Sequence, residues 1–249
     1  MDSVAIIQAR TGSTRLPKKI LMKLNGVSII ESVLNQLSFS KNLNNKIVAT
    51  TENQSDDILI ELLKSLNVNY FRGNQNDVLD RFYQCAKYFH IKQIIRISGD
   101  APFIDPSVID QTISFFNDSN FDYVNNFDNK HRYPVGSEVE VFSFQTLENA
   151  WKNAKKSSER EHVTPYIYNN PEIFEIGHLE YPKNDLSQYH WTVDRKEDLE
   201  FVKAIYQKIS KKPILIDDIL SLLKIHPEIL EINKNIDPHE GYKKSISED

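Results

Sequence analysis

Positive charge is concentrated in a short loop near the start of the chain. In the segment IIQARTGSTRLPKK (6–19), two arginines and two lysines follow an apolar stretch directly. Gly12 would let a ligand approach the backbone, and cations, hydroxyls and backbone N–H groups together bind polyphosphates. The loop has neither the Walker A pattern nor G-x-G-x-x-G. We expect an anion site here rather than a solvated basic loop, built from Arg10, Ser13, Thr14, Arg15, Lys18 and Lys19.

Two aspartates follow strand-like stretches further along the chain. Asp100 stands in RISGDAPF (96–103) and Asp194 in HWTVDRKEDL (190–199). Carboxylates at strand ends are suited to hold Mg²⁺ beside phosphates. The alternatives are a turn or cap role for Asp100, and a helix-capping box of Asp194 with Glu197. Together with the basic loop, the two aspartates predict metal-assisted phosphoryl transfer.

The elements that would position these groups alternate between strand and helix. Such alternation predicts an α/β fold with a mostly parallel sheet, in which ligands bind at the carboxyl ends of strands. Asp105 and Pro106 are typical of the cap and first position of a helix. We expect strands at 4–9, 46–50, 68–71 and 93–98, and helices at 28–39, 56–66, 77–89 and 105–116.

The pattern loosens after about residue 120. Residues 1–232 are expected to form a single domain, with an insertion at about 128–190 that could mediate dimerisation or contact an acceptor. A polar tail, 233–249, is expected to be frayed. Expected strands are 122–126, 138–144, 173–181 and 187–193; expected helices are 145–156, 159–170 and 196–209, with short helices in 216–230.

Composition narrows the class of protein. The net charge of −5 argues against non-specific nucleic-acid binding, and no apolar run approaches the length of a membrane span. The first residues lack the apolar region of a secretory leader, so we expect a cytoplasmic protein. Cys85 is expected to be a buried structural thiol. The seven histidines lack the spacing of a zinc site.

The basic loop also resembles the opening signature of the cytidylyltransferases that activate sugar acids. These are the 3-deoxy-manno-octulosonate and acylneuraminate enzymes, and the resemblance is closest to the spore coat polysaccharide biosynthesis protein F branch. It implies a Rossmann-like (GT-A-like) nucleotidyltransferase fold of three α/β/α layers, CTP and Mg²⁺ as ligand and cofactor, and a homodimer. The segments that carry it are IIQARTGSTRLPKKIL, RGNQNDVLDRF, RISGDAPFIDPSVID, YPVGSEVEVFS, REHVTPYIY and TVDRKEDLEFV.

The resemblance also implies roles for single residues. Arg15, Lys19 and Asp100 would be catalytic, and Asp100 and Asp194 would hold the metal. The nucleotide site would contain Gln8, Ala9, Arg10, Gly12, Ser13, Arg15, Lys19 and Gly99, with Arg72, Asp77, Asp80 and Arg81 closing near the base or sugar. The acceptor would meet Tyr133, Glu138, Glu140, Arg160, Glu161 and His162.

Structural alternatives exist for several of these residues. Asp77 and Arg81 have the spacing of an ion pair on a helix surface. Residues 160–162 could be a solvated helical face, and Tyr133 before a proline could fix an extended turn.

Two departures from the usual family pattern stand out. Lys18 replaces a glycine, and Arg195 and Lys196 replace an acid and a proline.

The predicted function is transfer of CMP from CTP to a sugar acid or related small acceptor, with release of pyrophosphate, for surface polysaccharide synthesis. A nucleotide-sugar-dependent glycosyltransferase is one alternative, although GDAP (99–102) lacks an Asp-x-Asp motif. A non-catalytic nucleotide-binding module is the other.

Overall fold

The centre of the molecule is a seven-stranded sheet. A computed structural model describes residues 2–127 and 132–249, and within them the strand order is β5-β4-β1-β6-β8-β7-β9. The pairs of β1, β4, β5 and β6 are parallel, whereas β8 runs antiparallel to both neighbours. The predicted α/β fold with a mostly parallel sheet is confirmed. The strands are β1 (Ser3–Gln8), β4 (Asn45–Thr51), β5 (Asn69–Gly73), β6 (Gln93–Ser98), β7 (Tyr123–Asn125), β8 (Glu140–Ser143) and β9 (Ile176–His178).

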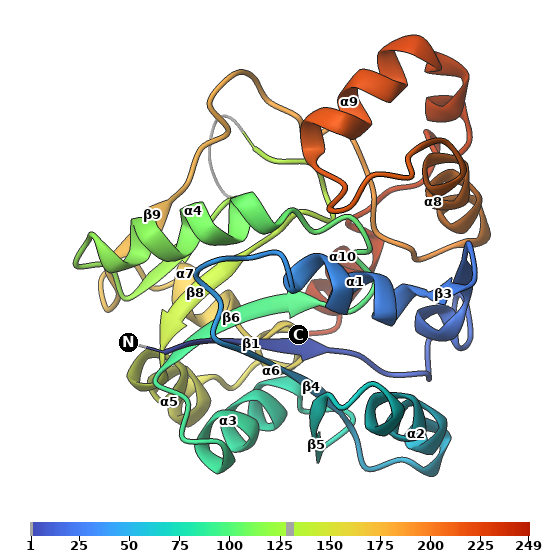
Figure 1. Cartoon of the computed structure of the whole chain (residues 1–249). Helices are drawn as coiled ribbons and strands as arrows, with labels where there is room; N and C mark the ends of the chain where they lie inside the picture. Colours follow the sequence, from blue (N-terminus) through green and yellow to red (C-terminus); the bar gives the residue numbers. More distant parts are fainter. Residues whose placement is uncertain (1, 128–131) are drawn as a thin grey trace.

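Helices cover both faces of this sheet (Figure 1). Successive side chains of a strand point to opposite faces, so β1 contributes to two cores. Ala5 and Ile7 pack with α1 (Ile29–Leu37) and α4 (Pro106–Asn117), and Val4 and Ile6 pack with α3 (Val78–Tyr88) and α5 (Phe144–Asn153). Burial on both faces is why the central strands read as continuous apolar runs.

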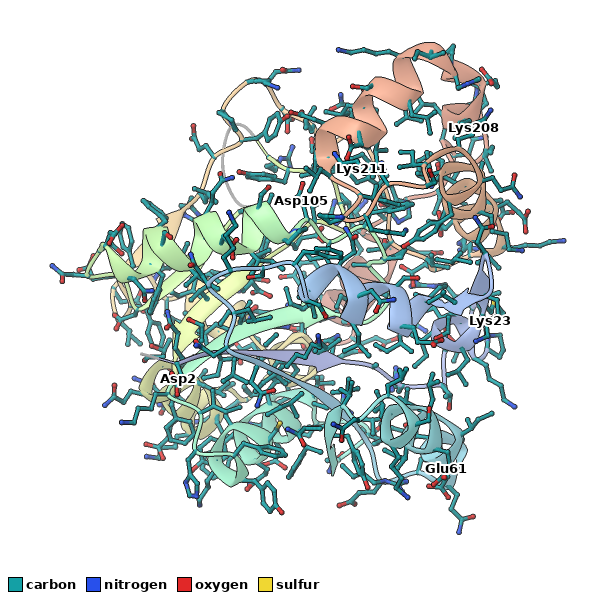
Figure 2. The ribbon with its side chains drawn as sticks, in the orientation of Figure 1. Asp2, Lys23, Glu61, Asp105, Lys208 and Lys211 are labelled. Atoms are coloured by element: carbon teal, nitrogen blue, oxygen red, sulfur yellow. The ribbon has the colours of Figure 1, made fainter. Side chains whose placement is uncertain are left out.

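The first turn of α4 confirms the predicted cap. Asp105 accepts a hydrogen bond from the Ser107 N–H at 2.8 Å, and Pro106 occupies the first turn. The second carboxylate oxygen of Asp105 accepts from the Ile216 N–H at 2.9 Å, which ties α4 to the start of α9 (Ile216–Ile225). Figure 2 shows Asp105 at this junction.

The remaining elements are short or peripheral. They are η1 (Lys19–Leu21), β2 (Lys23–Leu24), β3 (Val27–Ser28), η2 (Gln54–Asp56), α2 (Asp57–Ser65), α6 (Ser157–His162), α7 (Pro165–Tyr168), α8 (Lys196–Lys208), η3 (Pro227–Glu231) and α10 (Glu240–Ser247). Within the described ranges, no helix is long and apolar enough to span a membrane. Cys85 is buried as predicted, and burial raises the pKa of its thiol to about 12.

The second half of the chain departs from several predictions. Within the described ranges, the expected strand 187–193 does not join the sheet: it forms an isolated bridge between Val135 and His190, and the N–H of Val193 donates to the Asp100 carbonyl. The expected strand 173–181 shrinks to β9, and the expected helix 159–170 splits into α6 and α7 at Val163, whose φ is 73°. The start of the predicted insertion, 128–131, lies outside the described residues.

The C-terminal tail forms a helix, whereas the sequence predicted fraying. Side-chain contacts hold α10 to α6: Ser245 donates to Glu161 at 2.7 Å, and Ser158 donates through its N–H and hydroxyl to Asp249. These polar contacts, together with the Tyr242 ring against His162, hold this segment to the rest of the fold.

Candidate active site

A buried aspartate holds the basic loop in place. Asp56 accepts hydrogen bonds from the N–H and hydroxyl of Thr11, at 2.7 and 2.6 Å, and from the hydroxyl of Thr51. Burial opposes ionisation of Asp56, but the hydrogen bonds from these two threonines lower its pKa below the ordinary value. Asp56 thereby fixes the start of the loop to the end of β4.

The end of the loop explains the unusual lysine. Lys18 has φ 58° and ψ 22°, which is the left-handed conformation that glycine adopts without strain. The glycine in the usual family pattern therefore fits the backbone better than Lys18 does. The turn places the next side chain, Lys19, inward, where it is 10% exposed.

Lys19 joins the two predicted metal carboxylates. Its Nζ lies 2.5 Å from Oδ2 of Asp100 and 2.8 Å from Oδ1 of Asp194, and Arg15 Nη2 lies 2.7 Å from the same oxygen of Asp194. We call Arg15, Lys19, Asp100 and Asp194 the strand-end cluster. The structure thus unites four residues that lie up to 179 positions apart in the sequence.

The residues of the strand-end cluster shift one another's pKa values. Burial disfavours the charge of Lys19, yet Asp100 and Asp194 outweigh this effect and raise its pKa. Burial likewise opposes ionisation of Asp194, while Lys19 and Arg15 lower its pKa. These ion pairs favour the charged forms of Lys19 and Asp194, so an incoming anion or cation must exchange with a partner already present.

Backbone packing brings the strand ends together. The Gly99 N–H donates to the Gln8 carbonyl at 2.9 Å, and a Cβ on Gly99 would lie 2.7 Å from that oxygen and 2.8 Å from Cβ of Ala9. Glycine is therefore required there. The hydroxyl of Ser98 then donates to Asp100 at 2.6 Å.

Asp194 is not a helix cap. The cap of α8 is Arg195, and Asp198 accepts from the N–H groups of Arg195 and Asp194 at 2.8 and 3.1 Å. The predicted capping box of Asp194 with Glu197 is wrong, because Arg195 and Asp198, each one residue later, occupy the cap and N3 positions. This shift leaves the Asp194 carboxylate available to the strand-end cluster.

A cavity of about 680 Å³ opens beside this cluster. Tyr133, Glu138, Glu140 and His162, four of the predicted acceptor residues, line it. Gln8, Arg15, Asp100 and Asp194 line it as well. Burial raises the pKa of Glu138 to about 7, although the N–H of Gly136 donates to its carboxylate at 2.7 Å.

Arg160 and Glu161 do not line the cavity. Arg160 pairs with Asp77 at 2.5 Å and donates to the Trp151 carbonyl, so it joins α6 to the start of α3. Glu161 accepts from Ser245 of α10. Both residues have structural partners, and Asp77 pairs with Arg160 rather than with Arg81.

The other predicted nucleotide residues are spread around the basic loop. Arg72 donates to the carbonyls of Thr51 and Asn53, and Asp80 accepts from the Trp151 indole. Arg81 is buried; burial and the nearby Arg10 lower its pKa to about 10. Arg10 and Gly12 are exposed, and a Cβ on Gly12 would meet no atom of the described residues within 4 Å.

Sequence reasoning missed several cavity and support residues. Arg96 of β6 lines the cavity and pairs with Glu140, and its position inside an apolar strand was the available signal. The sequence pattern placed Asp56 only at the start of the predicted helix 56–66 and gave no sign of its contacts with the basic loop. Tyr242 of α10 lines the cavity from a segment that was expected to be frayed.

The metal-binding capacity of the site depends on how its carboxylates are grouped. Among the described residues, no group of three or more histidine, cysteine, aspartate or glutamate side chains could hold a metal ion. Asp100 and Asp194 form a pair only, which suits Mg²⁺ bound largely through phosphates and water.

A basic loop and two carboxylates meet where the strand order reverses between β1 and β6, the ligand site of doubly wound folds. This fold and site define a nucleotidyltransferase. The family model described as cytidylyltransferase matches residues 4–234, and the chain belongs to that family. The predicted resemblance is confirmed.

The chain is also similar to several proteins over much of its length. An uncharacterized protein of Methanocaldococcus jannaschii is 41% identical over 95% of this chain and 96% of its own. Spore coat polysaccharide biosynthesis protein SpsF of Bacillus subtilis is 34% identical over 91% and 96%. A 3-deoxy-manno-octulosonate cytidylyltransferase of Trichlorobacter lovleyi is 33% identical over 47% and 45%.

Solved structures agree as well. A cytidylyltransferase from Leptospira borgpetersenii superposes with a TM-score of 0.88 at 32% identity, covering 95% of this chain and 98% of that one. CMP:2-keto-3-deoxy-manno-octonic acid synthetase, solved with CTP, shares the fold with a TM-score of 0.66 at 16% identity, over 84% and 99% of the two chains.

Proposed function

We propose that this enzyme transfers CMP from CTP to a hydroxyl of a sugar acid or related small acceptor and releases pyrophosphate. The observation that carries the proposal is Lys19 held between Asp100 and Asp194 at the strand ends. This arrangement supplies one cation for a phosphate and two carboxylates for a metal within a single contact network.

The triphosphate would exchange partners with the strand-end cluster. Arg15 lines the cavity and Lys19 contacts Asp100 and Asp194, which line it, so both cations can turn from Asp194 to phosphate oxygens and stabilise the leaving pyrophosphate. The open space beside Gly12 allows phosphates to approach the loop backbone.

Asp100 and Asp194 would then be free to hold Mg²⁺. Two carboxylates with phosphate oxygens and water form a common magnesium environment, which fits the residues present. When bound, Mg²⁺ would offset the charge of the triphosphate and lower the pKa of the attacking hydroxyl. Ser98 would keep Asp100 oriented through its hydrogen bond.

Relatives support the acceptor class. One acts on 3-deoxy-manno-octulosonate by its name, and SpsF is named for spore coat polysaccharide biosynthesis. We therefore propose a role in surface polysaccharide or glycan synthesis. The homodimer and the cytoplasmic location stay predictions.

The test is release of pyrophosphate from CTP. We expect release that requires Mg²⁺, an acceptor from a panel of sugar acids, and CTP rather than ATP. Sugar transfer from a nucleotide sugar without pyrophosphate would support the glycosyltransferase alternative. CTP binding without turnover on any acceptor would support the non-catalytic alternative.

A further inference from the structure

One end of the cavity is formed by residues that the proposed nucleotide chemistry does not use. Arg96, His162, Tyr168 and Tyr242 line it, and we call these four residues the distal end. Arg96 and Ser98 lie on one face of β6, because alternate strand residues share a face. Arg96 lies about 7 Å further along the strand from Asp100 than Ser98 does.

Two buried nitrogen atoms of the distal end lack hydrogen-bond partners among the described residues. They are Nε of Arg96 and Nε2 of His162. The nearest carboxylate to the histidine nitrogen, on Glu161, lies 3.9 Å away, which is too long for a hydrogen bond. Buried polar groups are almost always paired, so these atoms indicate a site for a ligand that supplies oxygen atoms.

The charge of the distal end favours hydroxyls over a second anion. Arg96 is paired with Glu140 and donates to Gln8 at 3.0 Å, so its guanidinium is held rigidly and its charge is neutralised. Glu140 also accepts from Tyr123 and Thr164, at 2.6 and 2.5 Å. The pair therefore offers oriented polar groups without a net charge.

Helix α10 closes this end of the cavity. The hydroxyls of Tyr242 and Tyr168 lie 3.0 Å apart, and the His162 ring meets Tyr242 edge-on with centroids 4.9 Å apart. The family match ends at residue 234, so α10 lies outside the matched segment. A wall supplied by a segment beyond the matched region is well placed to distinguish acceptors.

We propose that the distal end is a subsite for the hydroxylated exocyclic chain of the acceptor, with Tyr242 and His162 as its specificity-determining residues. This inference rests on the proposed function. The attacking hydroxyl would lie near the strand-end cluster, while the remote hydroxyls would pair with His162, Arg96 and the two tyrosines.

The test compares two acceptors: 3-deoxy-manno-octulosonate and its analogue shortened by the two exocyclic carbons. In the wild type we expect shortening to lower kcat/KM at least ~10-fold, the equivalent of one or two hydrogen bonds. In Tyr242→Ala and His162→Gln we expect this ratio to fall below ~3-fold while the KM for CTP stays within about twofold. Tyr242→Phe, which keeps the ring, should give an intermediate ratio.

Tyr88→Ala is the matched control, because Tyr88 is 69% exposed on α3 and does not line the cavity. It should keep the wild-type ratio. Equal ratios in the wild type and the Tyr242 and His162 variants would overturn the subsite while leaving nucleotidyl transfer intact. Absence of pyrophosphate release with every sugar acid would instead overturn the proposed function, and the subsite with it.

Discussion

The strand-end cluster and the distal end share one cavity but differ in construction. The cluster consists of four charged side chains, each paired with an opposite charge at 2.5 to 2.8 Å. The distal end holds one neutralised ion pair, two tyrosines and a histidine, with two buried nitrogen atoms unpaired among the described residues. The charges of the strand-end cluster are already paired with one another, whereas the distal end has buried donor or acceptor atoms that a ligand could pair.

This difference indicates how each region would respond to a ligand. A ligand of the strand-end cluster must replace existing ion pairs. A polyanion bound together with a metal ion would compensate the free energy lost when those pairs break. Ligands of the distal end need only complete a set of hydrogen bonds, which suits discrimination between similar acceptors.

Lys19→Ala should have the largest effect. Removing one partner of a buried charge pair costs several kcal/mol, so CTP affinity should fall by roughly 10³-fold. Binding of CMP, which lacks the outer phosphates, should fall much less. Calorimetric titration of both nucleotides measures this, and equal losses would place Lys19 away from the triphosphate.

Asp56→Ala tests the anchor of the basic loop. It should lower the free energy of unfolding by about 3 kcal/mol, because the N–H and hydroxyl of Thr11 and the hydroxyl of Thr51 lose a charged acceptor. Urea unfolding measures the loss. Asp57→Ala is the control, since the exposed pair of Asp57 with Arg72 should contribute less than about 1 kcal/mol. Similar losses in both variants would contradict the anchoring role.

Glu138 lines the cavity, and its raised pKa predicts that the stability of the fold depends on pH. Its pKa is raised from 4.5 to about 7, so the folded protein holds this proton more tightly than the unfolded chain does. The contribution of this proton to the free energy of unfolding is fully present below pH 4.5 and is lost as pH rises through about 7.

Glu138→Gln cannot ionise. Relative to it, the wild type should lose about 2 kcal/mol of unfolding free energy between pH 4.5 and 8, a value reduced for the side chain's partial exposure. Urea unfolding across this range measures the difference. Parallel pH profiles for the two proteins would show that Glu138 titrates normally.

Lys18→Gly should have the smallest effect and a stabilising one. Glycine relieves the left-handed backbone at φ 58°, a gain of about 1 kcal/mol. Lys18→Ala keeps the same strain and should gain nothing. A stability change of equal size in both variants, measured by thermal unfolding, would assign the effect to the lost charge instead.

Local patterns predicted part of the strand-end cluster. The apolar run of β1, the glycine before Asp100 and the cap at Asp105 each act through near neighbours in the chain. The parallel fold then brings the strand ends together. These patterns indicate the basic loop, Asp100 and Asp194, whereas the choice of Arg15 and Lys19 among the four loop cations comes from the family resemblance.

Of the four residues of the distal end only His162 was predicted, through the family resemblance rather than a local pattern. Part of the wall of the distal end is α10. Polar contacts with Ser158 and Glu161 hold this segment in place, and its sequence shows no apolar periodicity that would have predicted a helix. Arg160 illustrates the opposite error, because a motif residue turned out to bind Asp77 and a backbone carbonyl outside the cavity. The extended segment 187–193 likewise looked like a strand, yet its backbone pairs across loops.

The most direct test of the central claim is the Mg²⁺ dependence of CTP binding, measured by calorimetry in the wild type and in Asp100→Asn. We predict that Mg²⁺ strengthens CTP binding at least ~10-fold in the wild type. In Asp100→Asn this gain should be lost. CTP binding that is equally strong with and without Mg²⁺, or a gain that survives in Asp100→Asn, would contradict a metal-assisted triphosphate site at the strand ends.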